Sequence, residues 1–537
     1  MMNYDSLCYP YPSRRMVIYA KNGMVATSQC LAAQAGLDIL KKGGNAIDAA
    51  IATAACLTVV EPTSNGIGGD AFSLIWTKGK LHGLNSSGPA PRNISLKAVK
   101  EAGHKKMPDF GWLPVTVPGV PEAWAILSDS FGQLSFKEIL MPAINYADKG
   151  YPVSPVVSAL WKIAYQRYKK NVQGEVFKYW FETFAPGGRT PEPGEIWKLP
   201  DQAHTLQSIA DSKSKSFYQG ELAEKIDSFS SRYGGFLTKE DLADFSPEWV
   251  NPIHVNYRGY DVWEIPPNGQ GLVALMALNI INGFEFTSKD DPETYHKQIE
   301  AMKLAFSDGK KYITESKQMT IKVEDLLSSG YAEERRKLIG KEALTPSPGR
   351  PPKGGTVYLA TADSEGNMVS YIQSNYMGFG SGLVVPGTGI SLQNRGSNFS
   401  LDPLDANCLQ PGKRTYHTII PGFLTKDNEA VGPFGVMGGF MQPQGHVQVI
   451  MNSLDFKLNP QAALDAPRWQ WIEKKKVIVE ESLPKHIAEA LDRKGHIIQI
   501  ALDSGGFFGR GQIIWKNDKE VLIGATEPRA DGVVAAW

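Results

Sequence analysis

The sequence predicts a protein of the α+β class, in which a largely helical first part leads into a strand-rich C-terminal part. Two helical patterns, at 28–42 and 46–60, precede a strand-like run at 71–76. Beyond Leu344 a linker rich in proline and glycine ends at Gly355, and β-branched and aromatic runs follow. With 537 residues, the chain can bury a sizeable core as one layered unit or as several domains.

The N-terminal helices are expected to form a buried pair. Segment 28–42 carries apolar residues at helical spacing and ends at Gly43-Gly44, which tolerate a left-handed cap. Segment 46–60 is small and apolar on most faces, as in closely packed helices. A glycine-dense turn at 65–70 then leads into the strand, where Lys78-Gly79 predicts a hairpin turn.

The middle of the chain, roughly 120–340, is expected to be a helical layer. Helical stretches at 121–131 and 292–315 alternate there with connectors rich in proline and glycine. No internal repeat or long low-complexity tract interrupts the chain.

A β-hairpin carries the chemistry that the sequence suggests. The runs 357–362 and 368–374 flank the turn Asp363-Ser364-Glu365-Gly366-Asn367. With Glu365 at the centre, antiparallel pairing places Ser374 opposite Thr356, at about 5 Å between Cβ atoms. Two hydroxyl side chains are therefore expected to face each other.

Thr356 is the candidate nucleophile of this hairpin. A hydroxyl is a weak nucleophile near neutral pH, and a freed α-amine on the same threonine can act as its base. This chemistry requires a cut before Thr356, where Gly355 allows the peptide to twist. The alternative from the residues alone is a structural threonine that begins a strand.

Composition and motifs argue against other classes of function. Lys+Arg and Asp+Glu balance at 56 each and no basic run is longer than Lys474-Lys475-Lys476, so no nucleic-acid partner is expected. The uncharged, apolar run at 49–60 is too short to cross a bilayer. The glycine motifs lack dinucleotide-binding spacing, the nine histidines form no HxxH pair, and neither cofactor nor metal is expected.

A cytoplasmic location is expected. Residues 1–22 contain no apolar stretch typical of a secretion signal. Cys8, Cys30, Cys56 and Cys408 form no short CxxC pair and fit a reducing compartment.

Six segments resemble the γ-glutamyltransferase (glutathione hydrolase) family, in the same order and over nearly the whole chain. They are GGNAIDAAIATAACLTVVEPTSNGIGGDAF (43–72), PGVPEAW (118–124), FYQGELAEKI (217–226), YRGYDVWEIPPNGQG (257–271), GTVYLATADSEGNMVSYIQSNYMGFGSG (355–382) and GATEPRADG (524–532).

The resemblance implies a four-layer αββα sandwich of the N-terminal-nucleophile type. It implies self-cleavage between Gly355 and Thr356 into a large subunit, 1–355, and a small subunit, 356–537, with a dimer of such heterodimers as one possibility. Thr356 would form a γ-glutamyl ester, Ser374 would be the second hydroxyl, and the backbone amides of Gly438 and Gly439 would form the oxyanion hole.

The substrate-binding positions depart from the family. An arginine that binds the substrate α-carboxylate is missing beside Ala90-Pro91. The matching positions that line the site are Tyr376, Arg395, Asn398, His417 and Thr418. We expect Arg395 to bind a terminal carboxylate, which favours a glutaryl-type amidase, as in cephalosporin acylases, as the second candidate. The alternative for Arg395 is a structural salt bridge.

Two further possibilities follow from these departures. An altered pocket is compatible with a catalytically silent binding protein on the same scaffold. The short segment between Phe399 and Lys413 leaves little room for the family's lid, so hydrolysis is expected over transfer to an amino acid or peptide.

Overall fold

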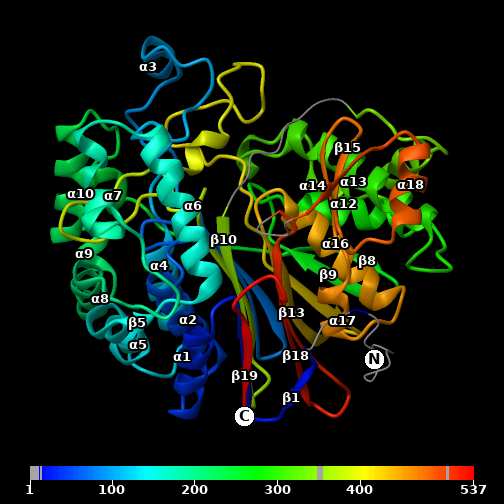
Figure 1. Ribbon diagram of the computed structural model, residues 1–537, viewed down its shortest axis with the longest axis horizontal. Helices are drawn as coiled ribbons and strands as arrows, with labels where there is room; N and C mark the ends of the chain where they lie inside the picture. The colour runs from blue at the N-terminus through cyan, green and yellow to red at the C-terminus, as the bar shows by residue number, and fades with distance from the viewer. Residues whose placement is uncertain (1–10, 12–14, 347–354, 503–506) are drawn as a thin grey trace.

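Two seven-stranded β-sheets face each other between two layers of helices in the computed structural model, which describes residues 11, 15–346, 355–502 and 507–537 (Figure 1). This arrangement confirms the expected four-layer αββα sandwich. Part of the linker that the sequence places before Thr356, residues 347–354, lies outside the described residues.

The first sheet contains the hairpin of Thr356 at its centre. Its strands, in spatial order, are β19 (Val533–Ala536), β2 (Gly23–Thr27), β10 (Gly355–Asp363), β11 (Met368–Tyr376), β3 (Asp70–Thr77), β4 (Lys80–Ser86) and β7 (Glu248–Val250). The second sheet has the order β1 (Ile18–Ala20), β18 (Leu522–Thr526), β17 (Arg510–Lys516), β13 (Glu429–Met437), β12 (Gly422–Lys426), β9 (Tyr260–Glu264) and β8 (Ile253–Tyr257).

The two-residue period of β10 places alternate side chains in two different cores. Tyr358 and Ala360 pack between the sheets, whereas Val357 and Leu359 pack against the first helical layer. Both faces of this strand are therefore buried, which accounts for its nearly continuous apolar sequence.

The first helical layer covers β10 and β11 with α2, which is buried along its whole length. An Asn45 capping box with Asp48 begins this helix, and its small side chains allow close approach to the sheet. The helices on this side are α1 (Cys30–Lys41), α2 (Ala46–Val60), α4 (Val120–Phe131), α5 (Phe136–Lys149), α6 (Pro155–Asn171), α7 (Lys178–Phe184), α8 (Pro200–Ser212), α9 (Lys215–Tyr218), α10 (Glu221–Arg232) and α11 (Lys239–Ala243), with α3 (Leu96–Glu101) set apart from them in Figure 1.

The second helical layer packs α12 and α16 against the other sheet. Its helices are α12 (Gly271–Ile281), α13 (Pro292–Tyr312), α14 (Val323–Leu326), α15 (Ser329–Arg336), α16 (Met441–Leu454), α17 (Pro460–Asp465) and α18 (Lys485–Arg493). Smaller elements are β5 (Tyr151–Pro152) with β6 (Ile196–Trp197), β14 (Trp469–Glu473) with β15 (Lys476–Glu480) and β16 (Ile497–Ala501), and four 3₁₀ turns at Glu175–Phe177, Pro186–Gly188, Ser316–Gln318 and Arg395–Asn398.

The region 120–340 is more than the helical layer that the sequence suggested. It supplies helices to both outer layers and also contributes β7, β8 and β9 to the edges of the two sheets. Short edge strands such as β7 bury few side chains, so they carry a weak alternation pattern.

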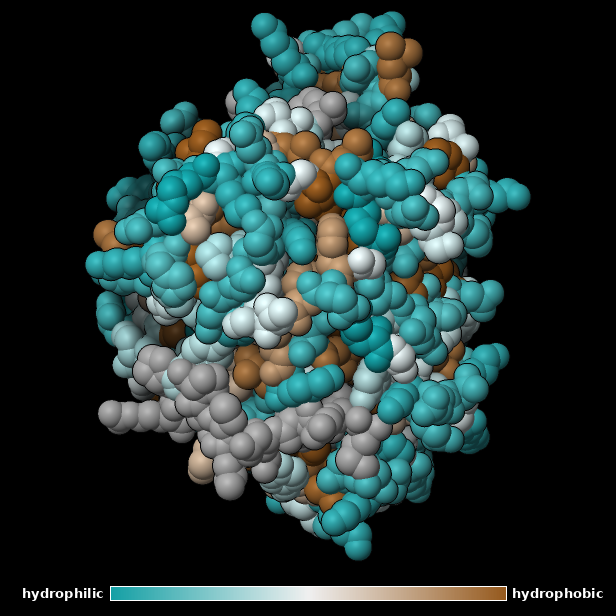
Figure 2. All heavy atoms as spheres, turned by 90° about the vertical axis from the view of Figure 1, so that its right-hand side faces the viewer, coloured by the Kyte–Doolittle hydropathy of each residue, from teal (hydrophilic) through white to brown (hydrophobic). Residues whose placement is uncertain are grey.

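The surface on the side of the second helical layer is mostly hydrophilic, with apolar atoms in separate groups between polar side chains (Figure 2). Among the described helices, none combines the length and apolar character needed to cross a membrane. The described cysteines, Cys30, Cys56 and Cys408, carry free thiols.

Candidate active site

The hydroxyl groups of Thr356 and Ser374 meet at the end of the central hairpin. Pairs from Val357 with Gln373 to Ala362 with Met368 confirm the register expected from the turn, and a bulge follows at Thr356. Thr356 Oγ1 donates a hydrogen bond to Ser374 Oγ over 3.2 Å, and the Thr356 side chain is buried. The sequence-predicted juxtaposition is therefore present.

Tyr376 fixes the position of Ser374. Its backbone N–H donates to Ser374 Oγ over 2.8 Å, while its own φ of 75° lies in the left-handed region that few non-glycine residues adopt. The phenol donates to Asn398 Oδ1 over 2.7 Å, and burial raises the pKa of Tyr376. These contacts hold the strained turn after β11 in place.

Asp70 is the centre of a buried polar cluster directly beside Ser374. It is the Cα partner of Ser374 in the ladder between β3 and β11. Its carboxylate accepts hydrogen bonds from His417 Nε2 at 2.8 Å, from Gln393 Nε2 at 2.8 Å and from the Gly88 N–H at 3.2 Å. The cluster therefore ties three separate segments to the strand that carries Ser374.

His417 is a neutral imidazole in this cluster. Burial, helped by the charge of Arg395, lowers the pKa of His417 to about 4. Its Nε2–H donates to Asp70, and its Nδ1 accepts a long hydrogen bond of 3.4 Å from the Ile419 N–H. Both ring nitrogens thus have assigned roles within the fold.

Arg395 lies entirely inside the same cluster. Its Nη1 donates to Thr418 Oγ1 over 2.7 Å, its Nε lies 3.6 Å from Asp70 Oδ2, and its guanidinium stands 4.5 Å from the Tyr376 ring centroid. Burial lowers the pKa of Arg395 to about 10. Among the described residues, its Nη2 has no hydrogen-bond partner. Arg395 therefore packs against the Tyr376 ring and forms an ion pair with the Asp70 carboxylate.

Gly438 and Gly439 form a tight turn between β13 and α16. Their φ values of 139° and 62° favour glycine. The Gly438 carbonyl accepts from the Met441 N–H, so the Gly439 N–H of the same trans peptide points away from α16. Gln270 Nε2 holds the Gly439 carbonyl at 2.9 Å. Such fixed amides can stabilise an oxyanion.

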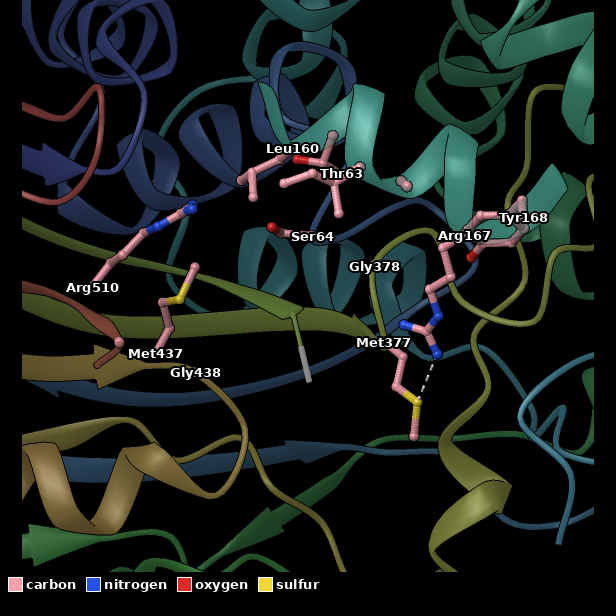
Figure 3. A pocket seen from close by; sticks show the side chains of 13 residues that line it. Thr63, Ser64, Leu160, Arg167, Tyr168, Met377, Gly378, Met437, Gly438 and Arg510 are labelled. Atoms are coloured by element: carbon pink, nitrogen blue, oxygen red, sulfur yellow. Dashed lines mark hydrogen bonds between the residues drawn. The ribbon is translucent and has the colours of Figure 1, made fainter. Parts of the chain in front are cut away.

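A cavity of about 170 Å³ adjoins this turn (Figure 3). One wall comes from α6, and the others come from the chain just beyond α2, from the ends of β11 and β13 and from the start of β17. The lining residues are Thr63, Ser64, Leu160, Ile163, Ala164, Arg167, Tyr168, Met377, Gly378, Met437, Gly438, Gly509 and Arg510.

Of the residues expected from the sequence, Gly438 lines the cavity, and Thr356, Ser374 and Gly439 lie outside its lining. Also outside the lining are Tyr376, Arg395, Asn398, His417 and Thr418, which are hydrogen-bonded to one another or to Asp70.

Sequence reasoning missed Asp70, Arg167 and Arg510. Asp70 is the last residue of the glycine-dense turn at 65–70 and pairs with Ser374, so the strand register could have indicated it. Arg167 and Arg510 lie in segments without a motif, and only tertiary structure places them at this cavity.

One group of buried side chains has ligand atoms close enough for a metal, within the part of the chain that the structure describes: His296, Glu300 and His496. Hydrogen bonds already use these atoms. His296 Nε2 bonds the Gly340 carbonyl at 2.9 Å, His296 Nδ1 bonds His496 Nε2 at 2.9 Å, and the Lys303 ammonium donates to Glu300 over 2.7 Å. An internal cation beside these atoms disfavours a metal ion.

Comparisons with known proteins extend along almost the whole chain. Residues 32–537 match the family model described as Gamma-glutamyltranspeptidase. The glutathione hydrolase-like YwrD proenzyme of Bacillus subtilis is 36% identical, over 95% of this chain and 97% of that protein. The oxamate amidohydrolase proenzyme of Klebsiella pneumoniae is 33% identical, over 96% and 98%. The crystal structure of a cephalosporin acylase from Bacillus halodurans is 66% identical, with a TM-score of 0.95 and 99% of both chains covered.

Proposed function

Because this chain belongs to the gamma-glutamyltranspeptidase family of N-terminal-nucleophile enzymes, we propose that it cuts itself before Thr356 and then uses Thr356 to cleave amide bonds. The observation that carries this proposal is the 3.2 Å hydrogen bond between the Thr356 and Ser374 hydroxyls at the beginning of β10. The relatives named as proenzymes support a precursor that is cut into a large and a small subunit.

In the precursor, Thr356 Oγ1 attacks the carbonyl carbon of Gly355. The new C–O bond replaces the C–N bond, and the hydroxyl proton passes to the Thr356 nitrogen. Water then hydrolyses this ester and leaves a carboxyl group on Gly355 and a free amino group on Thr356. The products are the subunits 1–355 and 356–537.

In the mature enzyme, the freed α-amine of Thr356 takes the proton from Oγ1 as the oxygen attacks a substrate amide. The Gly438 and Gly439 amides stabilise the oxyanion, and the α-ammonium returns its proton to the departing amine. Attack by water, or by the amine of an amino acid or peptide, releases the acyl group and restores the hydroxyl. Ser374 orients Oγ1 throughout.

The two subunits stay together after the cut because both sheets contain strands from each. In the first sheet, β10 and β11 of the small subunit lie between β2 and β3 of the large one. Separating the subunits would break the backbone hydrogen bonds of five ladders, three in the first sheet and two in the second, so the proposed product is a stable heterodimer.

The acyl group has two candidates. The family suggests γ-glutamyl transfer, as in a glutathione hydrolase. A glutaryl-type acyl group is favoured by the cavity beside Gly438, which is lined by two arginines and, among its described residues, no carboxylate. The likeness to a cephalosporin acylase supports the second candidate.

Electrophoresis and N-terminal sequencing of the purified protein test the proposal. The wild type should give two fragments derived from the 58.8 kDa chain, and the smaller should begin at Thr356. Thr356→Ala should stay as one chain. An uncut wild-type chain without amide turnover would instead indicate a silent binding protein and overturn the proposal.

A further inference from the structure

We propose that Arg167 on α6 determines acyl specificity by binding the terminal carboxylate of an ω-carboxyacyl amide, whose reacting carbonyl lies at Gly438. This inference rests on the proposed role of Thr356 and deepens it. It rests on one observation: the Arg167 side chain and an apolar face of α6 line the same cavity as Gly438.

The face of α6 that lines the cavity is apolar at one end and cationic at the other. Leu160, Ile163, Ala164 and Arg167 follow each other at i, i+3, i+4 and i+7, so they form one stripe on the helix. Ile163 is 64% exposed, so this wall reaches solvent and offers a route of entry. A ligand along the stripe would meet aliphatic surface first and a guanidinium at the end.

Of the two arginines in the cavity, Arg510 is already neutralised. Its Nη1 lies 3.2 Å from Glu61 Oε1, and both side chains are buried. Glu61 also accepts a hydrogen bond from Ser28 Oγ, so this pair belongs to the internal structure. Arg510 is therefore a poor partner for a second carboxylate.

Arg167 keeps most of its hydrogen-bonding capacity. Its nearest carboxylate, Asp109, lies 3.8 Å away, and both side chains are about 40% exposed, at 38% and 41%. Its Nη2 lies 3.6 Å from Met377 Sδ, a weak acceptor, and Figure 3 shows the guanidinium turned toward this residue. Stacking on Phe110 at 5.3 Å orients the guanidinium without using its N–H groups.

The lining selects for an acyl chain with a negative end and no ammonium group. A guanidinium can bind a carboxylate through two parallel hydrogen bonds. The described lining contains no carboxylate that could hold an α-ammonium, so a γ-glutamyl head would place its positive charge near the Arg167 guanidinium. Met377 and Met437 add apolar surface for a methylene spacer.

The size of the cavity limits the length of the chain. The cavity of about 170 Å³ has room for several water-sized groups. A spacer of a few methylenes with its carboxylate fits this space. The expected substrates are therefore amides of succinic, glutaric or adipic acid.

Matured wild type and Arg167→Met should be compared on three anilides: glutaryl, the uncharged pentanoyl and γ-glutamyl. Wild type should prefer the glutaryl compound. Arg167→Met should lose roughly 10- to 100-fold in kcat/KM for it, as expected for a charge-assisted hydrogen bond, and keep its activity on the pentanoyl compound. Arg189→Met, which removes an exposed arginine paired with Glu195, is the matched control and should behave as wild type.

Binding of free glutarate and of pentanoate, measured by calorimetry, tests the site without turnover. Glutarate should bind wild type and Arg189→Met, and Arg167→Met should weaken its binding at least tenfold. Unchanged glutarate binding, or an equal loss for all three anilides, would overturn the role of Arg167 even if Thr356 is cut and acylated. Failure of cleavage and acylation with normal glutarate binding would instead overturn the proposed function.

Discussion

Ser374 Oγ accepts hydrogen bonds from both the Thr356 hydroxyl, at 3.2 Å, and the Tyr376 N–H, at 2.8 Å. One oxygen therefore links the candidate nucleophile to the strained turn after β11.

Replacing Ser374 by alanine should slow both self-cleavage and amide turnover. The loss of one neutral hydrogen bond to Thr356 corresponds to roughly a 2- to 10-fold decrease in each rate. Ser374→Thr keeps the hydroxyl and should retain most of both. Time courses of fragment formation and of anilide hydrolysis measure the two rates.

Ser370→Ala is the matched control for this experiment. Ser370 lies on the same strand and face, and its hydroxyl bonds Tyr358 over 2.8 Å without contacting Thr356. Equal effects of the Ser370 and Ser374 variants on cleavage would show that Ser374 acts only through stability.

Gln270 should position the glycine turn. Its Nε2 donates to the Gly439 carbonyl at 2.9 Å and to the Thr418 carbonyl at 2.6 Å. Gln270→Leu removes both bonds and leaves the Gly439 carbonyl with the Gln442 N–H at 3.2 Å, so the turn that presents the Gly439 N–H should be held less firmly. We expect a decrease in kcat of roughly tenfold with KM nearly unchanged, because the oxyanion exists only after the substrate has bound.

Gln298→Leu provides a comparison for the Gln270 variant. Gln298 is a buried glutamine on α13 whose amide oxygen accepts from Trp469 Nε1 at 3.1 Å. Steady-state kinetics of both variants should show whether Gln270→Leu acts on the position of the glycine turn or only by destabilising the protein. A rise in KM at constant kcat for Gln270→Leu would contradict the assigned role.

The neutral state of His417 predicts a loss of stability in acid. The pKa of His417 is lowered from its model-compound value of 6.5 to about 4, so the unfolded chain binds this proton at a higher pH than the folded protein. The stabilisation is complete above about pH 6.5 and is lost as the pH falls toward 4, at about 1.4 kcal/mol per pH unit for one group.

Urea denaturation at several pH values measures this slope. His417→Gln keeps an N–H donor for Asp70 but cannot titrate, so its free energy of unfolding should change less steeply between pH 6.5 and 4. Replacing the exposed His254 by glutamine should leave the wild-type slope intact. An identical slope in wild type and His417→Gln would contradict the neutral assignment.

Two buried histidines should anchor the chain before the linker. The Lys303 ammonium contacts His496 Nδ1 at 3.4 Å, His496 Nε2 meets His296 Nδ1, and His296 Nε2 bonds the Gly340 carbonyl. If the Lys303 ammonium donates to His496 Nδ1, then His496 Nε2–H donates to His296 Nδ1 and His296 Nε2–H donates to the Gly340 carbonyl. Both imidazoles are then neutral, and each of their ring nitrogens has a hydrogen-bond partner. Lys303 also holds the Leu344 carbonyl at 3.1 Å.

His296→Leu removes the bond to Gly340 and should loosen segment 340–346. Hydrogen exchange of this segment should become faster. Self-cleavage before Thr356 should slow by a fewfold, because residues 340–346, which lead into the linker, would be held less firmly. Unchanged exchange in 340–346 would contradict the anchoring role.

The parts of this molecule that were predictable from sequence are those with local determinants. The five-residue turn around Glu365 fixes the register of β10 and β11, so the meeting of Thr356 with Ser374 could be expected before the fold was known. The apolar pattern of α2 was equally local.

The parts that were not predictable depend on contacts between distant segments. Arg167 lies on a helix without a motif, and only the packing of α6 against the ends of β11 and β13 brings it to the cavity. The packing of Arg395 against Tyr376 and Asp70 likewise depends on three separate segments. Sequence position indicated that Arg395 was near the site but not which partners it would meet.

The central claim is that Thr356, as the first residue of the small subunit, carries the acyl group. Intact-mass spectrometry of matured protein, quenched during turnover of a slow anilide, tests it directly. The fragment 356–537 should gain the mass of one acyl group, peptide mapping should place it on Thr356, and hydroxylamine should remove it as an ester. An acyl group on another residue, or turnover by Thr356→Ala at the wild-type rate, would show that Thr356 is not the nucleophile.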